Sequence, residues 1–515
     1  MRRWGSMVVA LGLFTLDCHT EYRATFVKRP DFGSIGDHKD DPFLKCHMKD
    51  GHVIVLEAWT VDDVAKTVRG YGLEYDVNRE RIGPLEAKVV RLDDVVLVET
   101  NKPYAFQVGT GSIIALAIGT GVSIGVTVMC ATNTKACFGS CPTFFADDGH
   151  GLALQAEGFS DAVARALETT DVDAMWTAAP KSRDFDVVMT NDALETHVVD
   201  SVRVLAARRP PGGRVLRAGT EYFEATRFTA PKSARADAGD VADKLRASDG
   251  DEYKSPASAT NLADREHVDV IFPRPAGAKR LGLLVVDRNS LLNTFLFYQA
   301  LAYAGRRAGD WLAALEAEGK SGFAGLGRLL GDIDVSVRDA SGRYVDAGKV
   351  GEVGPIAREA ELVVFPDEVA RGTGDVEVRL TMARGNWKID QIALVDVGAR
   401  VEPVALDPRT VTKDGKRDDD ARIALLDPKR HLVTYPHDAY TLEFELPEGD
   451  QELFLESRGY YYEWMREEWL REEDPLAAAR MVLRPDVALR ELAPKFKAIE
   501  PTMDRIFWQS RVPRW

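Results

Sequence analysis

Hydrophobic and polar residues alternate over much of this chain, which predicts a mainly β protein. Between residues 66 and 76, Tyr71, Leu73 and Tyr75 alternate with glycine or acidic residues, the two-residue period of a half-buried strand. Similar short segments lie at 52–59, 87–92, 95–99 and 105–109. Strands so closely spaced predict a small β-barrel or roll over residues 38–109.

The same alternation returns in the second half of the chain. It covers residues 333–338 and recurs at 376–382 and 442–446. Alternation of apolar and polar residues gives each sheet one buried face and one solvent-exposed face, which is typical of an antiparallel sandwich. We therefore expect a β-rich domain at 132–400, and further strands followed by helices at 421–515.

Four segments depart from this alternation and predict other elements. Residues 281–286 are continuously apolar and indicate a buried strand, whereas about 290–305 are apolar on all sides and predict a core helix. The polar stretch 233–266 predicts a disordered loop, and 460–473 looks helical. The predicted fold class is mainly β and multidomain (α+β), with a small N-terminal barrel, a sandwich-like region, a buried helix and a helical C-terminus.

The start of the chain has the pattern of an export leader. Basic residues precede ten mostly apolar residues at 7–16, which is too short for a membrane-spanning helix. The run ends almost at Cys18, and residues 16–18 resemble the lipobox of bacterial lipoproteins, although that pattern has a small residue where Asp17 stands. The resemblance implies a leader at 1–18, a lipidated Cys18 and, from His19 after it, outer-membrane sorting. The alternatives are another exported form, or an ordinary N-terminal strand or helix.

A second apolar segment, residues 112–131, is a rival membrane anchor. Its twenty residues carry no charge, which meets the length of a transmembrane helix. The competing interpretation is a buried hairpin, because β-branched residues dominate and Gly119 to Gly121 would form its turn. The helix is the favoured interpretation. It would place the chain in the inner membrane, whereas sorting of a lipidated Cys18 to the outer membrane would not.

Cys137 and Cys141 are separated by three residues and are candidates for a small disulfide loop. Free thiols or a metal site are the alternatives, but a single pair at this spacing is a poor zinc signature. The residues around Cys141, with the two phenylalanines at 144–145 and a turn at 147–149, resemble a motif of uncharacterised bacterial envelope proteins. That resemblance implies no known activity.

The charge balance excludes one class of partner. The chain has 515 residues and a formal net charge of −15. Nucleic acids require a basic face, so nucleic-acid binding is not expected.

Chemistry-bearing residues do not form a recognisable catalytic motif. His38, Cys46, His47 and His52 come nearest to a metal cluster, but their spacing fits no known metal site and solvated histidines are favoured. We therefore predict no catalytic residues, no metal and no cofactor.

An aromatic cluster is the remaining candidate site. It includes Tyr461, Trp464 and Trp469. Such side chains bind sugars or protein partners when exposed, and otherwise pack in a core.

These patterns predict a membrane-tethered protein of the cell envelope, in the outer membrane or on the periplasmic side of the inner membrane. Its predicted role is that of a non-enzymatic scaffold or binding module for a protein or glycan partner. An exported hydrolase acting on a wall polymer and a membrane subunit of a transport or secretion assembly are the alternatives.

Overall fold

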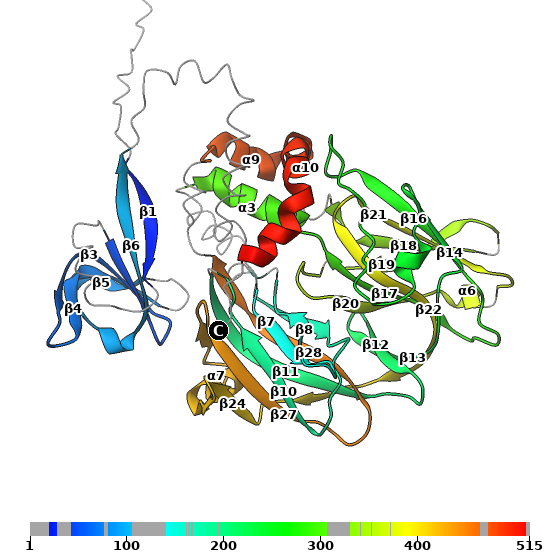
Figure 1. Cartoon of the computed structure of the whole chain (residues 1–515), viewed down its shortest axis with the longest axis horizontal. Coiled ribbons are helices and arrows are strands. Elements are labelled where there is room, and N and C mark those ends of the chain that lie inside the picture. The colour runs from blue at the N-terminus through cyan, green and yellow to red at the C-terminus, as the bar shows by residue number, and fades with distance from the viewer. Residues whose placement is uncertain are drawn as a thin grey trace, which may run out of the picture. The chain divides into compact units, whose positions relative to one another are not determined.

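The computed structural model describes two compact units of the chain, Met1–Gly119 and Thr120–Trp515. The described residues are 20–27, 43–76, 81–105 and 141–510, without 161, 163–164, 166–167, 194, 306–329, 340, 352, 371 and 464–471. The fold is mainly β, as the alternation predicts: largely antiparallel sheets form both units, and helices join them in the second (Figure 1).

The first unit is a six-stranded sheet with the strand order β1-β6-β2-β3-β4-β5. Its strands are β1 (Thr20–Val27), β2 (Phe43–Met48), β3 (Val53–Asp62), β4 (Thr67–Tyr75), β5 (Arg81–Arg91) and β6 (Val95–Ala105). Leu44, Leu56, Val68 and Val98 are fully buried and form the centre of its core. The strands predicted between residues 52 and 99 are confirmed. β1, which pairs with β6, adds a strand from outside the predicted range.

The second unit contains three open sheets and one closed barrel. We name them after one strand each: the β8 sheet (β25-β24-β27-β10-β7-β8), the β28 sheet (β23-β11-β28-β9, with β26 on β11), the β21 sheet (β15-β14-β16-β21-β18-β19) and the barrel (β12-β13-β22-β17-β20). The strands of the β8 sheet are β7 (Thr143–Asp147), β8 (Leu152–Glu157), β10 (Asp184–Thr190), β24 (Thr410–Lys413), β25 (Lys416–Arg417) and β27 (Ala439–Glu445). Those of the β28 sheet are β9 (Thr169–Ala174), β11 (Glu195–Arg208), β23 (Val404–Leu406), β26 (Leu432–Thr434) and β28 (Gln451–Glu463).

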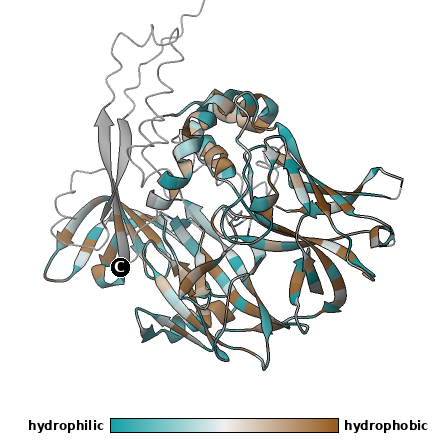
Figure 2. Ribbon diagram, turned by 45° about the vertical axis from the view of Figure 1, so that its right-hand side comes forward, coloured by the Kyte–Doolittle hydropathy of each residue, from teal (hydrophilic) through white to brown (hydrophobic). Residues whose placement is uncertain are grey.

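The remaining strands belong to the barrel and the β21 sheet. The barrel consists of β12 (Arg214–Ala218), β13 (Glu221–Thr229), β17 (Leu281–Asn289), β20 (Glu359–Val364) and β22 (Trp387–Val401). The β21 sheet consists of β14 (Ser233–Ala236), β15 (Gly239–Asp240), β16 (Arg265–Phe272), β18 (Ile333–Arg338), β19 (Tyr344–Val350) and β21 (Val376–Ala383). Brown and teal residues alternate along many of these strands (Figure 2), as expected of sheets with one buried face.

The barrel strand β17 packs against a different core cluster on each of its two faces. Its Leu283 and Val285 join a core cluster with residues of the β21 sheet. Leu284 and Val286 point the other way and join a cluster that includes Phe454 of the β28 sheet. A strand covered on both faces must be apolar throughout, so the prediction of a buried strand at 281–286 is confirmed.

Three helices form a further core beside the sheets (Figure 1): α3 (Leu292–Ala304), α9 (Pro475–Leu483) and α10 (Pro485–Ser510). α3 confirms the predicted core helix, and it ends at Gly305, whose φ of 53° favours glycine. Phe295 of α3 packs against Phe496 of α10, with ring centroids 5.2 Å apart. Asp474 caps α9 through the backbone N–H groups of the first helical turn.

Among the described residues, no helix combines the length and the apolar character needed to cross a bilayer. The apolar segment 112–131 lies outside them.

Two local predictions need correction. The stretch 233–266, expected as a disordered loop, contains β14, β15 and a short 3-10 helix, η4 (Ala242–Leu245), and leads into β16. Ala234, Leu245 and Tyr253 are buried there, so a few small or isolated apolar residues suffice to pack the segment. Residues 460–463, the described start of the segment expected as helix, instead form the end of β28, where they pair with residues 195–198 of β11.

Candidate functional site

Several of the residues singled out from the sequence lie outside the described part of the chain. This applies to Cys18, Cys137, Trp464 and Trp469. Cys141 is buried just before β7, but its pairing with Cys137 stays a prediction.

Tyr461, the described member of the aromatic cluster, is an interior residue. Its side chain is 6% exposed, and its hydroxyl donates a hydrogen bond to the carbonyl oxygen of Ser160 (3.0 Å). The ring of His197, also fully buried, meets it edge-on with centroids 6.4 Å apart. Tyr461 therefore packs within the β28 sheet and does not present its ring at a surface.

Of the residues considered as metal ligands, Cys46, His47 and His52 lie in the described part of the first unit, and His38 lies outside it. Cys46 and His47 are buried in β2, and burial raises the pKa of the Cys46 thiol to about 12. Nδ1 of His52 lies 3.0 Å from Oε1 of Glu74. In the described ranges, no group of three or more His, Cys, Asp or Glu side chains is arranged to hold a metal ion.

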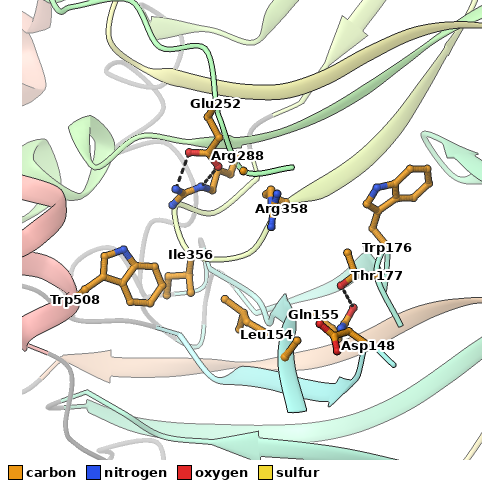
Figure 3. A pocket seen from close by; sticks show the side chains of 12 residues that line it. Asp148, Leu154, Gln155, Trp176, Thr177, Glu252, Arg288, Ile356, Arg358 and Trp508 are labelled. Carbon is orange, nitrogen blue, oxygen red and sulfur yellow. Dashed lines mark hydrogen bonds and ion pairs between the residues drawn. The ribbon is translucent and has the colours of Figure 1, made fainter. Parts of the chain in front are cut away.

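The candidate site is a pocket of about 400 Å³ in the second unit. It is lined by the turn after β7, by β8, by the segment after β9, by the segment between η4 and β16, by β17, by the segment before β20 and by the end of α10 (Figure 3). Its principal lining residues are Asp148, Leu154, Gln155, Trp176, Thr177, Glu252, Arg288, Ile356, Arg358 and Trp508. Pockets of roughly 300–1,000 Å³ are the usual size for small ligands.

Arg288 and Glu252 form a fixed ion pair at one side of the pocket. Nε and Nη2 of Arg288 donate to the two carboxylate oxygens of Glu252, at 2.6 and 2.7 Å, and Nη1 donates to the carbonyl oxygen of Pro355 (2.7 Å). Both carboxylate oxygens of Glu252 are thereby engaged. This bidentate geometry leaves the pair little freedom to rearrange.

Arg358 is held differently, by one hydrogen-bonded carboxylate, that of Asp390. Its Nη1 donates to Asp390, a fully buried carboxylate that also accepts from the hydroxyl of Ser248 (2.7 Å) and the backbone N–H of Gly250 (2.8 Å). Among the described residues, Asp390 is the only hydrogen-bond partner of the Arg358 side chain. Because a guanidinium carries five N–H donors, the others remain for a ligand.

Gln155 and Asp148 supply polar groups on the opposite side (Figure 3). The hydroxyl of Thr177 donates to Oε1 of Gln155 (3.0 Å), which fixes the amide. Nε2 of Gln155 is buried and has no hydrogen-bond partner within the described ranges. One oxygen of Asp148 accepts from the backbone N–H groups of His150 (2.8 Å) and Gly151 (3.0 Å), so a tight turn orients this carboxylate.

Two tryptophans flank these polar groups. Figure 3 shows Trp176 and Trp508 on opposite sides of the view, with Arg288 and Arg358 between them. The guanidinium of Arg214 lies 3.5 Å from the centroid of the Trp176 ring, a cation–π contact that fixes that ring. Trp508 is 45% exposed near the end of α10.

An ion pair between a buried lysine and a half-exposed aspartate links the barrel to α10. Lys388 of the barrel, only 6% exposed, bonds to Asp504 at 2.8 Å, one helical turn before Trp508. Burial lowers the pKa of Lys388, an effect that the charge of Arg288 increases and that Asp504 opposes.

The carboxyl groups with the most perturbed acidity lie elsewhere. Burial raises the pKa of Glu359 to about 8 and raises the pKa values of Asp173 and Asp287 well above their usual range. None of the three is a lining residue of the pocket, whose carboxylates are Asp148 and Glu252. The carboxylates of the lining are therefore that of Glu252, which is fixed in an ion pair, and that of Asp148, which accepts hydrogen bonds within a turn. The arrangement that a glycosidase requires is different: a carboxyl group with a raised pKa that faces a second carboxylate.

Sequence reasoning missed this pocket because its residues come from six separate segments between positions 148 and 508. A motif search detects residues close together in the chain, and here the longest consecutive run is Ala153, Leu154 and Gln155, in which Gln155 alone has a polar side chain. Trp176 and Trp508 were visible as isolated aromatic residues, but nothing local connects them.

Comparisons with known proteins leave the chain without a family. No family model matches it, and no curated protein sequence does. A solved structure that it matches is a β-porphyranase of glycoside hydrolase family 86 from the human gut bacterium Bacteroides plebeius, with 12% identity and a TM-score of 0.15. The match covers 44% of this chain and 36% of that chain. A likeness of this size carries no argument about fold or activity.

Proposed function

We propose that this chain is a glycan-binding protein of the cell envelope, and that the pocket between Trp176 and Trp508 is its binding site. The observation that supports this most is the combination of two tryptophans with fixed polar groups between them. Sugar rings have apolar C–H faces that stack on aromatic rings and hydroxyl groups that bond to planar polar side chains. Arg358, Gln155 and Asp148 offer such groups, each held by neighbouring protein atoms.

Binding is favoured over hydrolysis by the state of the carboxylates. Glycosidases need one carboxyl group to act as acid and a second to act as base or nucleophile. In this pocket Glu252 gives both of its oxygens to Arg288, and Asp148 orients a turn. An exported hydrolase stays the alternative, and release of reducing ends from a bound glycan would support it.

The proposed location rests on the leader at 1–18, with a lipid on Cys18 or the segment 112–131 as the anchor. Substitution Cys18→Ala should abolish incorporation of labelled palmitate if the lipid is the anchor. Reporters fused before and after residues 112–131 should give opposite topologies if that segment spans the membrane. Unchanged labelling, or signals from the same side, would exclude the respective anchor.

Binding is tested with the full chain on an array of neutral and acidic glycans, followed by calorimetry on the best glycan. We expect Trp508→Ala to weaken binding about tenfold or more, since tryptophans at the centre of a contact carry much of its free energy. Because Trp508 is 45% exposed, this substitution should leave the unfolding temperature nearly unchanged. Tyr71→Ala is the control, an aromatic residue 51% exposed in the first unit. Absence of glycan binding, or equal affinities of all three proteins, would refute the proposal.

A further inference from the structure

The pocket offers hydrogen-bond donors without protein partners in the described part of the chain on both of its sides, from Gln155 on one and Arg358 on the other. Nε2 of Gln155 belongs to a side chain that is only 3% exposed, and it has no partner among the described atoms. Arg358 keeps the donors that Asp390 does not use. A buried donor without a partner costs free energy, so a ligand atom that accepts from it would be bound favourably.

The acceptors nearby are largely occupied. Both oxygens of Glu252 bind Arg288, and Asp390 already accepts from Arg358, Ser248 and Gly250. Asp148 retains one carboxylate oxygen that the turn does not use. A sugar hydroxyl can donate and accept at once, so it could bridge this oxygen and the Gln155 amide.

We propose that the glycan is acidic, and that Arg358 selects it by binding a carboxylate or sulfate group while Gln155 and Asp148 bind neighbouring hydroxyls. This inference rests on the proposed function. A guanidinium presents parallel N–H groups that match the paired oxygens of such an anion, and these charge-assisted hydrogen bonds are stronger than neutral ones. Asp390 orients the guanidinium from behind, so its geometry exists before the ligand arrives.

Long-range attraction does not contribute to this selectivity. The chain carries a net charge of −15, which repels an anionic glycan at a distance. The preference must therefore come from short contacts inside the pocket. Added salt, which screens repulsion between the two partners, should leave the affinity unchanged or raise it slightly.

The test compares matched pairs of ligands by calorimetry on the full chain. The pairs are oligogalacturonate with its methyl ester, and sulfated with desulfated galactan oligosaccharides. We expect one acidic member to bind about tenfold or more tightly than its neutral partner, as a charge-assisted contact would give. The pair that shows the difference identifies carboxylate or sulfate as the group recognised.

Two variants connect this preference to Arg358. Removing the arginine alone would leave Asp390 buried without its cation, so Arg358→Gln is combined with Asp390→Asn. Arg358→Lys keeps the charge and loses the planar fork. We expect the double variant to abolish the preference for the acidic ligand and the lysine variant to reduce it. Arg409→Gln, at an exposed arginine paired with Asp184 at 2.9 Å, is the matched control and should bind as the parent does.

The outcomes separate the two proposals. Two results would overturn the role of Arg358 and leave the proposed function standing. One is binding that depends on Trp508 but is equally strong for the neutral and acidic members of both pairs. The other is a preference for the acidic ligand that survives in the double variant. Failure of every glycan to bind would overturn the proposed function as well.

Discussion

The substitution Glu359→Gln should reduce the loss of stability that the chain suffers in alkaline solution. Glu359 lies at the start of β20 and is 2% exposed. Both of its oxygens accept from the backbone N–H of Ala174, at 3.0 and 2.8 Å, and Nη2 of Arg217 lies 3.7 Å from Oε1. The carboxyl groups of Glu361, Asp173 and Asp287 interact electrostatically with it or with one another, so a single arginine faces several acids.

The size of the effect follows from the shift in acidity. Burial is the largest cause that raises the pKa of Glu359 from 4.5 to about 8; Arg217 lowers it and Glu361 raises it further. A shift upward means that the unfolded chain loses its proton first. The stabilisation is therefore complete below pH 4.5 and is lost as the pH rises through 8. At about 1.4 kcal/mol per pKa unit, the free energy of unfolding falls by an amount on the order of 5 kcal/mol. Changes in the protonation of the neighbouring acids reduce this amount.

Glutamine cannot ionise, but its amide oxygen still accepts from Ala174. Urea unfolding of the parent and the variant at pH 5, 7 and 9 measures the difference directly. We expect the free energy of unfolding of the variant, relative to that of the parent, to rise by several kcal/mol between pH 5 and pH 9. The size of this rise follows from the pKa shift of Glu359. Glu402→Gln, at a glutamate 79% exposed, is the control and should follow the parent. Parallel pH curves for parent and Glu359→Gln would refute the reasoning.

Three further predictions test other parts of the second unit. The hydrogen bond from His431 to Asp200 is the main cause that raises the pKa of His431, so its stabilisation is complete below pH 6.5 and disappears as the pH rises through the raised value. His431→Gln should therefore destabilise the chain most at pH 5.5 and progressively less as the pH is raised, which urea unfolding measures. Leu284→Ala, at a fully buried position in β17, should cost about 2–5 kcal/mol, whereas Val404→Ala, 55% exposed, should cost far less. Asp474→Ala removes the cap of α9 and should lower the free energy of unfolding by about 1 kcal/mol; an unchanged midpoint would contradict that role.

Local periodicity predicted the elements whose burial is regular. β18 and β21 alternate because one face of each meets the core, and every second side chain in them is buried. β17 and α3 are covered on all sides, so they appear in the sequence as continuous apolar runs. Each of these signals arises within a dozen or so neighbouring residues and needs no knowledge of the partner element.

Elements whose stability comes from distant partners were predicted poorly. β14 contains only alanine, serine and arginine, yet it pairs with β16, and its two alanines are buried. Residues 460–463 have helix-like composition, but they pair with β11, more than two hundred positions earlier. Tertiary pairing overrides local propensity in both cases, and the sequence alone does not reveal which partner is present.

The pocket is a stronger case of the same limit, because its chemistry depends on residues that do not line it. Arg358 is oriented by the buried Asp390, and the Trp176 ring is fixed by Arg214, which in turn bonds to Glu452 at 2.6 Å. Removing one partner of a buried charged pair is costly, since the other charge is left without compensation. Asp390 in the barrel and Glu452 in the β28 sheet are such buried carboxylates, so replacing either one would leave an arginine beside the pocket without this partner. The packing of the sheets therefore brings the six distant segments of the pocket together, and it also supplies the buried partners that orient their side chains.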